Sequence, residues 1–194
     1  MAASANHPEL KGTRVCLRRP TRRDARSLLR LKRSSRAHLT PWEATPHGGA
    51  DPFSMRWFDG FLRTSHTVQS RRFLVCRSDD GEIVGQLGLG GIVRGAVQSC
   101  YLGYWIGSTF EGQGLMSEAV RLALAHAFGP LGLHRVEANV IPRNRRSASL
   151  VRRLGFRPEG LARRYLRIAG RWQDHVHWAI TAEEWRRGVR SKPG

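Results

Sequence analysis

The chain has 194 residues, which is enough for one domain with a sizeable core and too short for two comfortable ones. Hydrophobic residues make up 40% of the chain, which excludes a disordered protein. The net charge of +18 favours binding partners that are polyanions, such as phosphates, RNA or acidic lipid surfaces. Three widely spaced cysteines and the lack of an apolar run of about 18 residues exclude a disulfide scaffold and a membrane span, and favour a reduced, cytoplasmic setting.

The sequence predicts a loosely attached N-terminal arm over residues 1–10, followed by a single domain over residues 11–190. Thr21 and an acidic residue three positions later have the spacing of a capping box, which predicts the start of a helix. Asp51 followed by Pro52 predicts the start of a second helix. The expected segments are a strand over residues 14–19, a helix from residue 22, a loop over residues 40–49 and a helix from residue 52 that ends between residues 65 and 70.

The middle of the chain is predicted to form an antiparallel meander, because its apolar runs are joined by very short turns. The spacing of apolar residues then changes to that of a helix. This helix has little polar surface, so we expect it to be largely buried. The meander strands are expected over residues 73–76, 82–92 and 98–106, and the buried helix over residues 115–128.

The last third alternates again between strands and helices. A short basic helix ends at a glycine, and a capping box opens the final helix. The expected segments are a strand over residues 135–141, a helix over 145–154, a strand over 156–160, a hairpin of strands over 166–168 and 172–180, and a helix from residue 182.

A glycine-containing turn between a strand and the buried helix is the most informative segment. It reads Thr-Phe-Glu-Gly-Gln-Gly over residues 109–114. Glycine lets the backbone approach a ligand closely, and the free N–H groups of the first helical turn favour an anion such as a pyrophosphate. An ordinary strand–helix turn remains the alternative reading.

A second segment stands at the start of the basic helix. Asn144 and Ser147 are three residues apart there, and Gly155 and Phe156 follow the helix. Asn144 is also a suitable N-cap residue, so a purely structural role is the alternative.

In this order and spacing the two segments resemble the motifs of the GCN5-related N-acetyltransferase (GNAT) superfamily. Further matches narrow the resemblance to the RimJ/RimL type, the N-terminal acetyltransferases of ribosomal proteins, over roughly residues 12–185. These matches stand at residues 41–45, 101–106, 131–138, 159–160 and 165–175. The resemblance implies an α/β fold with a central mixed, mostly antiparallel sheet of about seven strands, flanked by helices and splayed open between two parallel central strands, residues 98–106 and 135–141.

The same resemblance implies acetyl-CoA as co-substrate, bound in the cleft between those strands, and no metal. The pantetheine arm would pair with the first strand, the pyrophosphate would lie on the glycine turn, and the thioester would lie near the second segment. The residues assigned to the cofactor in this way are Tyr104, Trp105, Ile106, Phe110, Glu111, Gly112, Gln113, Gly114, Leu115, Met116, Asn144, Arg145 and Ser147.

Two positions depart from the superfamily pattern. The first motif position is Thr109 rather than Gln or Arg, so a side-chain contact there is in question. The tyrosine that many members use as a general acid is Val151 here. Ser147 or water would then protonate the leaving thiolate, which a thiol with a pKa near 8.5 tolerates at neutral pH.

The general base is the least determined part of the site. Several relatives carry a Glu five residues before the motif Asn, where this chain has Asn139. Glu137 lies two residues earlier on the same face of the strand and is the first candidate, with a structural ion pair to an arginine as the alternative. An acid that some relatives carry just before Tyr165 is Arg164 here. The catalytic set is therefore Glu137, Asn139 and Ser147.

A weak or missing base favours an N-terminal acceptor. An α-amine has a pKa of about 7.7–8.0, whereas a lysine amine has one of about 10.4. We therefore expect direct attack by a protein α-amine, with backbone donors of the first central strand stabilising the oxyanion. Trp42, Glu43 and Tyr165 are the expected substrate-binding residues.

Two alternatives remain open from the sequence. One is acetylation of a small amine such as an antibiotic or polyamine, for which Glu43, Asp51 and Asp59 are the few acids that would attract a cation. The other is a ribosome- or RNA-binding factor with vestigial activity, since ten arginines lie between Arg143 and Arg171. Oligomerisation is left open, and a metal at His175 and His177 is set aside for want of a third ligand.

Overall fold

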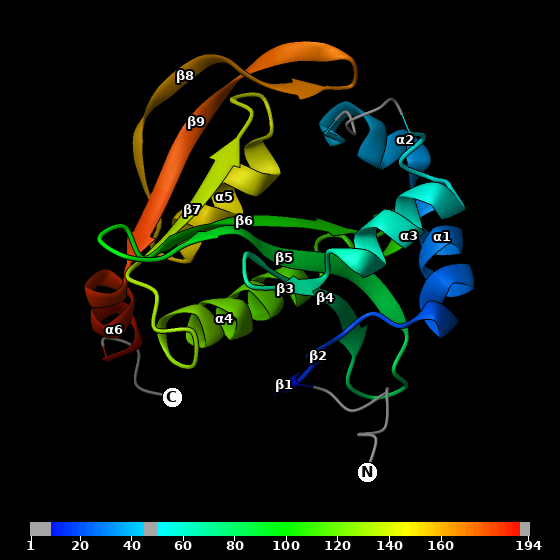
Figure 1. Cartoon of the computed structure of the whole chain (residues 1–194), viewed down its shortest axis with the longest axis horizontal. Coiled ribbons are helices and arrows are strands. Elements are labelled where there is room, and N and C mark those ends of the chain that lie inside the picture. Colours follow the sequence, from blue (N-terminus) through cyan, green and yellow to red (C-terminus); the bar gives the residue numbers. More distant parts are fainter. Residues whose placement is uncertain (1–8, 45–49, 191–194) are drawn as a thin grey trace.

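The computed structural model describes residues 9–44 and 50–190 and shows one mixed sheet with helices against both of its faces (Figure 1). The described strands follow the order β1-β2-β4-β5-β6-β7-β9-β8, and β3 pairs with β4. The strands are β1 (Leu10–Lys11), β2 (Val15–Arg18), β3 (His66–Thr67), β4 (Ser70–Arg77), β5 (Ile83–Val93), β6 (Ser99–Ile106), β7 (Arg135–Val140), β8 (Arg157–Ile168) and β9 (Arg171–Thr181). The helices are α1 (Ala25–Ser34), α2 (Arg36–Leu39), α3 (Met55–Arg63), α4 (Leu115–Phe128), α5 (Arg145–Arg153) and α6 (Ala182–Arg190).

The central strands β6 and β7 are parallel, while their neighbours in the described sheet are antiparallel. Their pairing runs from Ser99 opposite Arg135 to Tyr101 opposite Glu137 and then stops. Both strands continue past that point, so the sheet opens into a V between them. The predicted mixed sheet with two parallel central strands is confirmed, and the strands beyond the expected seven are the two-residue β1 and β3.

The two faces of the sheet carry separate hydrophobic clusters. Along β4, Phe73 and Val75 point to one face, and Leu74 and Cys76 point to the other. The first face packs against α4 and α5 and forms the main core. The second face is covered by α1 and α3, whose cluster also takes in the start of β5. This second cover reaches Trp105 near the end of β6, and in the part of the chain that the structure describes its cluster includes no residue of β7 or β9.

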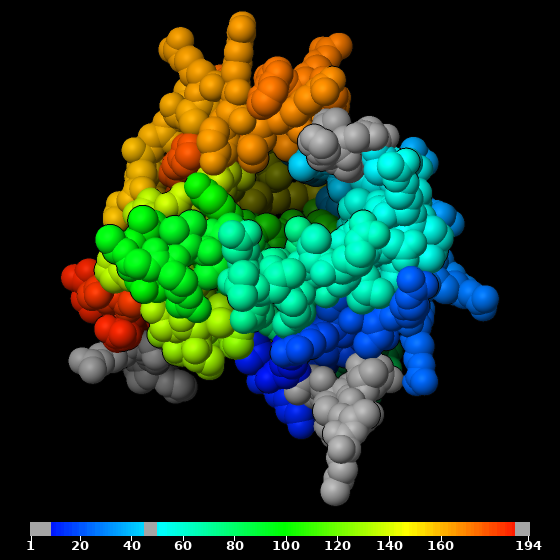
Figure 2. All heavy atoms as spheres, in the orientation of Figure 1, coloured from blue at the N-terminus to red at the C-terminus, as the bar shows by residue number. Residues whose placement is uncertain are grey.

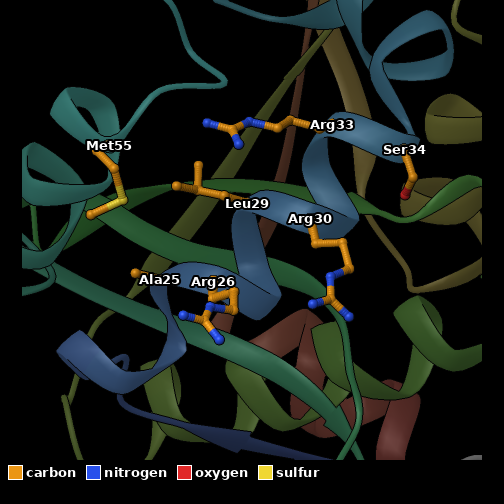
Figure 3. A pocket seen from close by; sticks show the side chains of 7 residues that line it. All are labelled: Ala25, Arg26, Leu29, Arg30, Arg33, Ser34 and Met55. Carbon is orange, nitrogen blue, oxygen red and sulfur yellow. The ribbon is translucent and has the colours of Figure 1, made fainter.

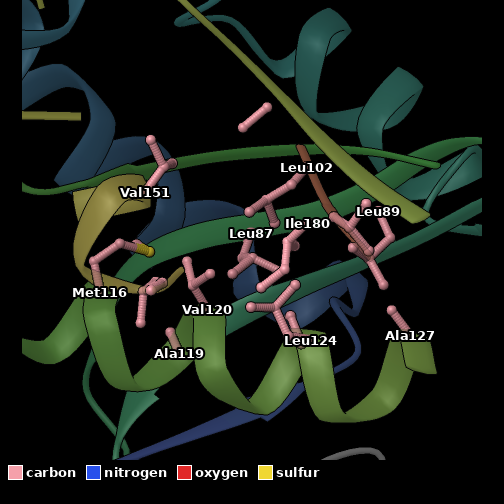
Figure 4. Close-up of a cluster of buried hydrophobic side chains, with 14 of the residues drawn as sticks. Leu87, Leu89, Leu102, Met116, Ala119, Val120, Leu124, Ala127, Val151 and Ile180 are labelled. Atoms are coloured by element: carbon pink, nitrogen blue, oxygen red, sulfur yellow. The ribbon is translucent and has the colours of Figure 1, made fainter. Parts of the chain in front are cut away.

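The main core is organised around α4, which lies along the sheet with apolar residues on most of its surface (Figure 4). Ala119, Val120 and Leu124 are fully buried against strands β5, β6 and β9. The small alanine side chains let the helix approach the sheet closely, and the observed burial agrees with the prediction made from its sparse polar surface. Its predicted bounds are those observed.

The two predicted helix starts near Thr21 and Asp51 differ in how well they agree with the structure. At Thr21 the backbone N–H donates to the Asp24 carboxylate at 2.7 Å, so the capping-box contact is present, but a 3₁₀ turn precedes α1. Before α3 the cap is Ser54, whose hydroxyl accepts from the N–H of Trp57 at 3.2 Å. Asp51 instead accepts from the N–H of Phe53 at 3.1 Å, in a turn one step earlier. The expected start at residue 52 is therefore wrong by one turn, because two capping residues follow one another closely.

The C-terminal hairpin is longer than expected. Residues 157–168 form one strand rather than two pieces, because bulges interrupt its alternation between Pro158 and Gly160 and between Ala162 and Leu166. At the second bulge Arg164 has a φ of +48°, and its N–H donates to the Asp174 carboxylate at 2.8 Å. A bulge shifts the period of two, so the sequence pattern hides the continuity of the strand.

At the two ends of the domain, the predictions from the sequence agree only in part with the structure. Glu9 and Leu10 of the expected arm join the sheet, since the Glu9 N–H donates to Leu17 and Leu10 pairs with it; residues 1–8 lie outside the described part of the chain. The Thr181 N–H donates to the Glu184 carboxylate at 2.8 Å, so the capping box of α6 is confirmed. No helix among the described residues is long and apolar enough to cross a membrane.

Candidate active site

The opening between β6 and β7 exposes one backbone edge of β6. On its other edge β6 pairs with β5 as far as Ile106 opposite Gly85. On the β7 side the pairing ends at Tyr101, so the N–H and C=O groups of residues 102–106 that point into the opening have no partner in β7. Unpaired backbone groups of this kind bind an extended ligand that carries amides. The predicted residues Tyr104, Trp105 and Ile106 lie on this edge.

The glycine turn lies beside the end of that edge, at the start of α4. Gly112 and Gly114 have φ values of +72° and +78°, which favour glycine over any residue with a Cβ. Gly114 is the N-cap of α4, and the first helical hydrogen bond runs from the Glu118 N–H to its carbonyl. The N–H groups of the three residues between them are left free to bind an anion.

Side chains from other elements hold this turn without occupying those N–H groups. The Arg14 guanidinium donates to the Gln113 carbonyl at 2.8 Å, and the Glu118 carboxylate accepts from the Arg14 N–H at 2.9 Å. Thr109 takes part through its carbonyl, which accepts from the Gln113 amide at 3.1 Å. The departure from Gln or Arg at this position therefore leaves the cradle itself intact.

The other residues that the sequence assigns to the cofactor differ in whether their side chains are available to a ligand. The Leu115 and Met116 side chains are buried in the main core, and Phe110 packs against that core, so Leu115 and Met116 can offer a ligand only their N–H groups. Glu111 turns toward α5, where its carboxylate lies 2.5 Å from Arg146. Arg145 is exposed and stands next to this pair, where a phosphate could reach it.

Asn144 and Ser147 begin α5 at the opposite wall of the opening. The Asn144 side chain accepts from the Ser147 N–H at 3.1 Å, so Asn144 is the N-cap of the helix. The Ser147 hydroxyl lies 2.7 Å from the Tyr104 hydroxyl across the opening. Burial raises the pKa of Tyr104 to about 12. Val151, at the position of the superfamily tyrosine, is fully buried in the core and faces away from the opening.

One face of β7, β8 and β9 gathers the predicted catalytic and acceptor residues. Asn139 on β7 pairs in register with His177 on β9, and Glu137 lies two residues along the same face. The Tyr165 ring of β8 lies 4.7 Å from the His177 ring and 5.9 Å from the His175 ring. Burial and then the nearby Tyr101 hydroxyl and Glu137 raise the pKa of Tyr165. Glu137, Asn139 and Tyr165 therefore share one surface.

Within this surface Glu137 forms an ion pair, whereas the side-chain carbonyl of Asn139 lacks a hydrogen bond. The Arg135 guanidinium donates to Glu137 at 2.7 Å and also binds Glu159 on β8. The structural ion pair considered from the sequence is thus present. The Asn139 side-chain carbonyl is buried and has no hydrogen-bond partner among the described residues. A buried acceptor without a donor favours a ligand that brings one.

Trp42 and Glu43 lie at the mouth of the same surface. Glu43 accepts two hydrogen bonds from Lys32, at 2.8 and 2.9 Å, and its carbonyl accepts from the Ala169 N–H at 3.0 Å. Trp42 lies under the Arg143 guanidinium, 5.1 Å from its ring centroid. The tip of the β8–β9 hairpin is thereby joined to the segment after α2. Figure 2 shows the resulting hollow, ringed by this hairpin and α3, with the colours of β6 and α5 at its floor.

Lys32 is the site residue that sequence reasoning missed. Its side chain is 1% exposed, and its ammonium lies 4.3 Å from the Trp57 ring and 5.3 Å from the Trp105 ring. Burial lowers the pKa of Lys32, while Glu43 opposes that shift. The available signal was a lysine one helical turn after Leu28 on the apolar face of α1, in a chain with only three lysines among its 33 lysines and arginines.

No group of three His, Cys, Asp or Glu side chains in the described part of the chain could hold a metal ion. A groove of about 770 Å³ lies between α1 and α3, and Arg26, Arg30 and Arg33 line it together with Leu29 and Met55 (Figure 3). None of the predicted site residues lines this groove.

The open V between two parallel strands, the glycine turn at the start of α4 and the Asn that caps α5 are the features expected of an acetyltransferase that uses acetyl-CoA. The family model for the acetyltransferase (GNAT) domain matches residues 14–157, and the chain belongs to this family. It is an acetyl-CoA-dependent N-acetyltransferase.

Particular relatives support the narrower resemblance. The chain is 36% identical over 188 residues to the [ribosomal protein uS5]-alanine N-acetyltransferase of Escherichia coli, covering 95% of this chain and 97% of the relative. The solved structure of Mycobacterium smegmatis RimJ with CoA-disulfide matches with a TM-score of 0.79 and 35% identity, over 91% of this chain and 88% of that one. The ribosomal-protein-S5-alanine acetyltransferase of Vibrio fischeri matches with a TM-score of 0.77 and 28% identity, over 94% and 98% of the two chains.

Proposed function

We propose that the enzyme transfers an acetyl group from acetyl-CoA to the α-amine of a protein N-terminus, and that the protein is a ribosomal one. The likeness to the Escherichia coli uS5-alanine acetyltransferase over nearly the whole of both chains supports this acceptor class. The resemblance covers the acceptor surface as well as the cofactor motif, since it includes the segments that carry Glu43 and Tyr165.

The charged residues near the mouth favour a peptide acceptor over a polyamine. A polycation needs free carboxylates, and the three acids that could supply them each have a basic partner. The pairs are Lys32–Glu43 at 2.8 Å, Arg36–Asp51 at 3.8 Å and Arg22–Asp59 at 3.8 Å. A peptide N-terminus brings at most one positive charge to this mouth, whereas a polyamine brings several. The electrostatic repulsion is therefore weaker for the peptide.

The chemistry of this surface also suits an α-amine. Roughly a third of such amines are neutral near pH 7.5, so direct attack on the thioester carbonyl needs little help from a base. In our proposal the free Asn139 carbonyl accepts a hydrogen bond from the amine, and Glu137 takes up its proton. The backbone N–H groups at residues 104–106 stabilise the oxyanion that forms on the acetyl carbonyl.

The test is thiol release from acetyl-CoA with matched acceptors. The set is a peptide with a free N-terminal Ala, the same peptide N-blocked but bearing Lys, and a small polyamine. We expect turnover with the free N-terminus to exceed the other two by at least tenfold. Turnover with the polyamine alone would replace this proposal with the small-amine alternative.

Contact with ribosomal RNA is a second part of the proposal, carried by the arginines that line the groove in Figure 3. Arg26, Arg30 and Arg33 are exposed and spaced four and three residues apart, so they form one face of α1. Such a row suits successive phosphates. Binding to 16S ribosomal RNA fragments should weaken steeply with salt, and Arg26→Gln with Arg30→Gln should reduce the slope of log K against log salt by about 2. Binding that is independent of salt would remove this part.

We also place the enzyme in the cytoplasm. Cys16, Cys76 and Cys100 are free thiols, which fits a reducing compartment.

A further inference from the structure

Two hydroxyl groups meet across the cofactor opening. The Tyr104 hydroxyl on β6 lies 2.7 Å from the Ser147 hydroxyl on α5. The two residues come from opposite walls of the V, and each is set by its own element. Their contact is therefore a property of the tertiary fold that neither motif contains.

The direction of this hydrogen bond follows from acidity. A phenol proton is more acidic than that of an aliphatic alcohol, so Tyr104 is the better donor and Ser147 the acceptor. Burial raises the pKa of Tyr104 to about 12, so the phenol keeps its proton at neutral pH. The proton of the Ser147 hydroxyl is then free to point elsewhere. Its backbone cannot turn away, because its N–H is bound to Asn144 at 3.1 Å.

No other residue of α5 can supply this group. Val151 stands where the superfamily pattern has a tyrosine, and its side chain is apolar and fully buried. Ser149 is exposed, and its hydroxyl makes no hydrogen bond within the described structure. Among the described residues, the only phenol that reaches the start of α5 is that of Tyr104, from β6 on the other wall.

We propose that Tyr104 is a positioning residue that aims the Ser147 hydroxyl at the sulfur of the leaving thiolate. This inference rests on the proposed function, in which the acetyl donor lies in this opening with its thioester beside Ser147. In the step concerned, the amine lone pair forms the C–N bond, the C–S bond breaks and its electron pair stays on sulfur. The amine proton leaves to Glu137 or water, and the thiolate takes a proton from water after the Ser147 hydroxyl has stabilised it. A donor that is polarised by a second hydroxyl stabilises an anion better than a lone alcohol.

The decisive measurement uses the product complex and needs no acceptor. Free thiols have a pKa near 8.5, and the ultraviolet absorbance of the thiolate reports the pKa of the CoA thiol when it is bound. We expect the wild-type protein to lower that pKa by about one unit. Tyr104→Phe, which keeps the ring, and Ser147→Ala should each restore it to within about 0.3 units of free CoA. Binding of desulfo-CoA should change by less than about twofold in both variants.

Further variants distinguish an effect of the two hydroxyl groups on the CoA thiol from an effect of the substitutions on packing. Ser149→Ala on the same helix should leave the thiol pKa unchanged. The double variant Tyr104→Phe with Ser147→Ala should shift it no further than Ser147→Ala does, because the two hydroxyls act as one unit. In turnover, Tyr104→Phe should lower kcat about tenfold with little change in the KM for acetyl-CoA.

Distinct outcomes overturn the two proposals. A shift with Ser147→Ala but none with Tyr104→Phe would show that Ser147 acts alone and would overturn the inference. A lowered thiol pKa that depends on both hydroxyls would support it even if no tested N-terminus is acetylated, in which case only the proposed acceptor is wrong. A wild-type protein that binds no CoA would overturn both.

Discussion

The ammonium group of Lys32 lies 2.8 Å and 2.9 Å from the two carboxylate oxygens of Glu43, and the side chain of Lys32 is almost completely buried. Trp57 and Trp105 lie beside the ammonium, so the charge is held between a carboxylate and aromatic faces. Because the Glu43 carbonyl also binds Ala169, this pair joins α1 to the tip of the β8–β9 hairpin. It therefore helps to set both the shape and the charge of the mouth at which we propose that the acceptor binds.

Lys32→Met should destabilise the protein by about 3 kcal/mol, because it leaves the partly buried Glu43 carboxylate without its partner. Lys32→Met with Glu43→Gln should recover part of that loss, since no charge is left unpaired. Urea unfolding measures both. Lys11→Met removes an exposed lysine on β1 and should cost less than about 0.5 kcal/mol.

The same Lys32→Met variant should gain activity toward a small polyamine, because Glu43 is then free to bind a cation. The measurement is thiol release with the polyamine at a temperature where the variant is folded. Unchanged discrimination between polyamine and peptide would show that this pair supports the fold but does not select the acceptor.

The buried pair between Arg18 and Asp24 should make stability fall in acid. Two hydrogen bonds of 2.6 and 2.9 Å join the side chains. Burial by itself would raise the pKa of Asp24, but hydrogen bonds from Arg18 and Thr21 outweigh it, and the pKa lies below its usual value. A carboxyl with a lowered folded-state pKa stabilises the protein above the unfolded-state pKa of about 3.9, and that contribution is lost as the pH falls further.

Asp24→Asn should therefore cost about 3 kcal/mol at pH 7, and the difference from wild type should shrink below about pH 4. Urea unfolding between pH 7 and pH 3 checks this. Asp79→Asn, which alters an exposed carboxylate, should stay close to wild type throughout. A difference for Asp24→Asn that is constant with pH would contradict the assignment.

Gly112→Ala should weaken CoA binding about tenfold. A Cβ at this position meets no atom within 4 Å, but φ is +72°, so alanine strains the turn or changes it. Gly95→Ala is the matched control, because Gly95 has a φ of +70°, equally open space, and a position in the turn between β5 and β6. Both variants should lose about 1 kcal/mol of stability in urea. Calorimetric titration with CoA should separate them, and equal affinities would mean that the turn does not cradle the phosphates.

Glu137→Gln should move the acidic limb of the pH–rate profile upward. If Glu137 takes the proton, the wild-type enzyme keeps activity below the pKa of the acceptor amine, and the variant follows the free-amine fraction with a midpoint near pH 8. Glu159→Gln is the control, since Glu159 shares Arg135 with Glu137 and lies outside the proposed chemistry. A profile that Glu137→Gln leaves unchanged would remove Glu137 as the base.

Much of the local structure is predictable from the sequence because its causes are local. The bounds of α4 follow from its apolar period, and the turn at Gly112 and Gly114 follows from the conformations that glycine allows. The capping boxes at Thr21 and Thr181 are formed by residues three apart. Where two local signals compete, as at Asp51 and Ser54, the prediction shifts by one turn.

The sequence by itself predicted the family, most of the order of the elements and the glycine turn that we propose to bind acetyl-CoA, since each depends on residues that are close together in the chain. Only the tertiary structure decided which side chains meet. Tyr104 and Ser147 stand on opposite walls of the opening, Lys32 and Glu43 come from different segments, and Arg135 joins β7 to β8. These contacts depend on where the sheet splays, twists and bulges, and those features arise from packing of the whole chain, which no local spacing encodes.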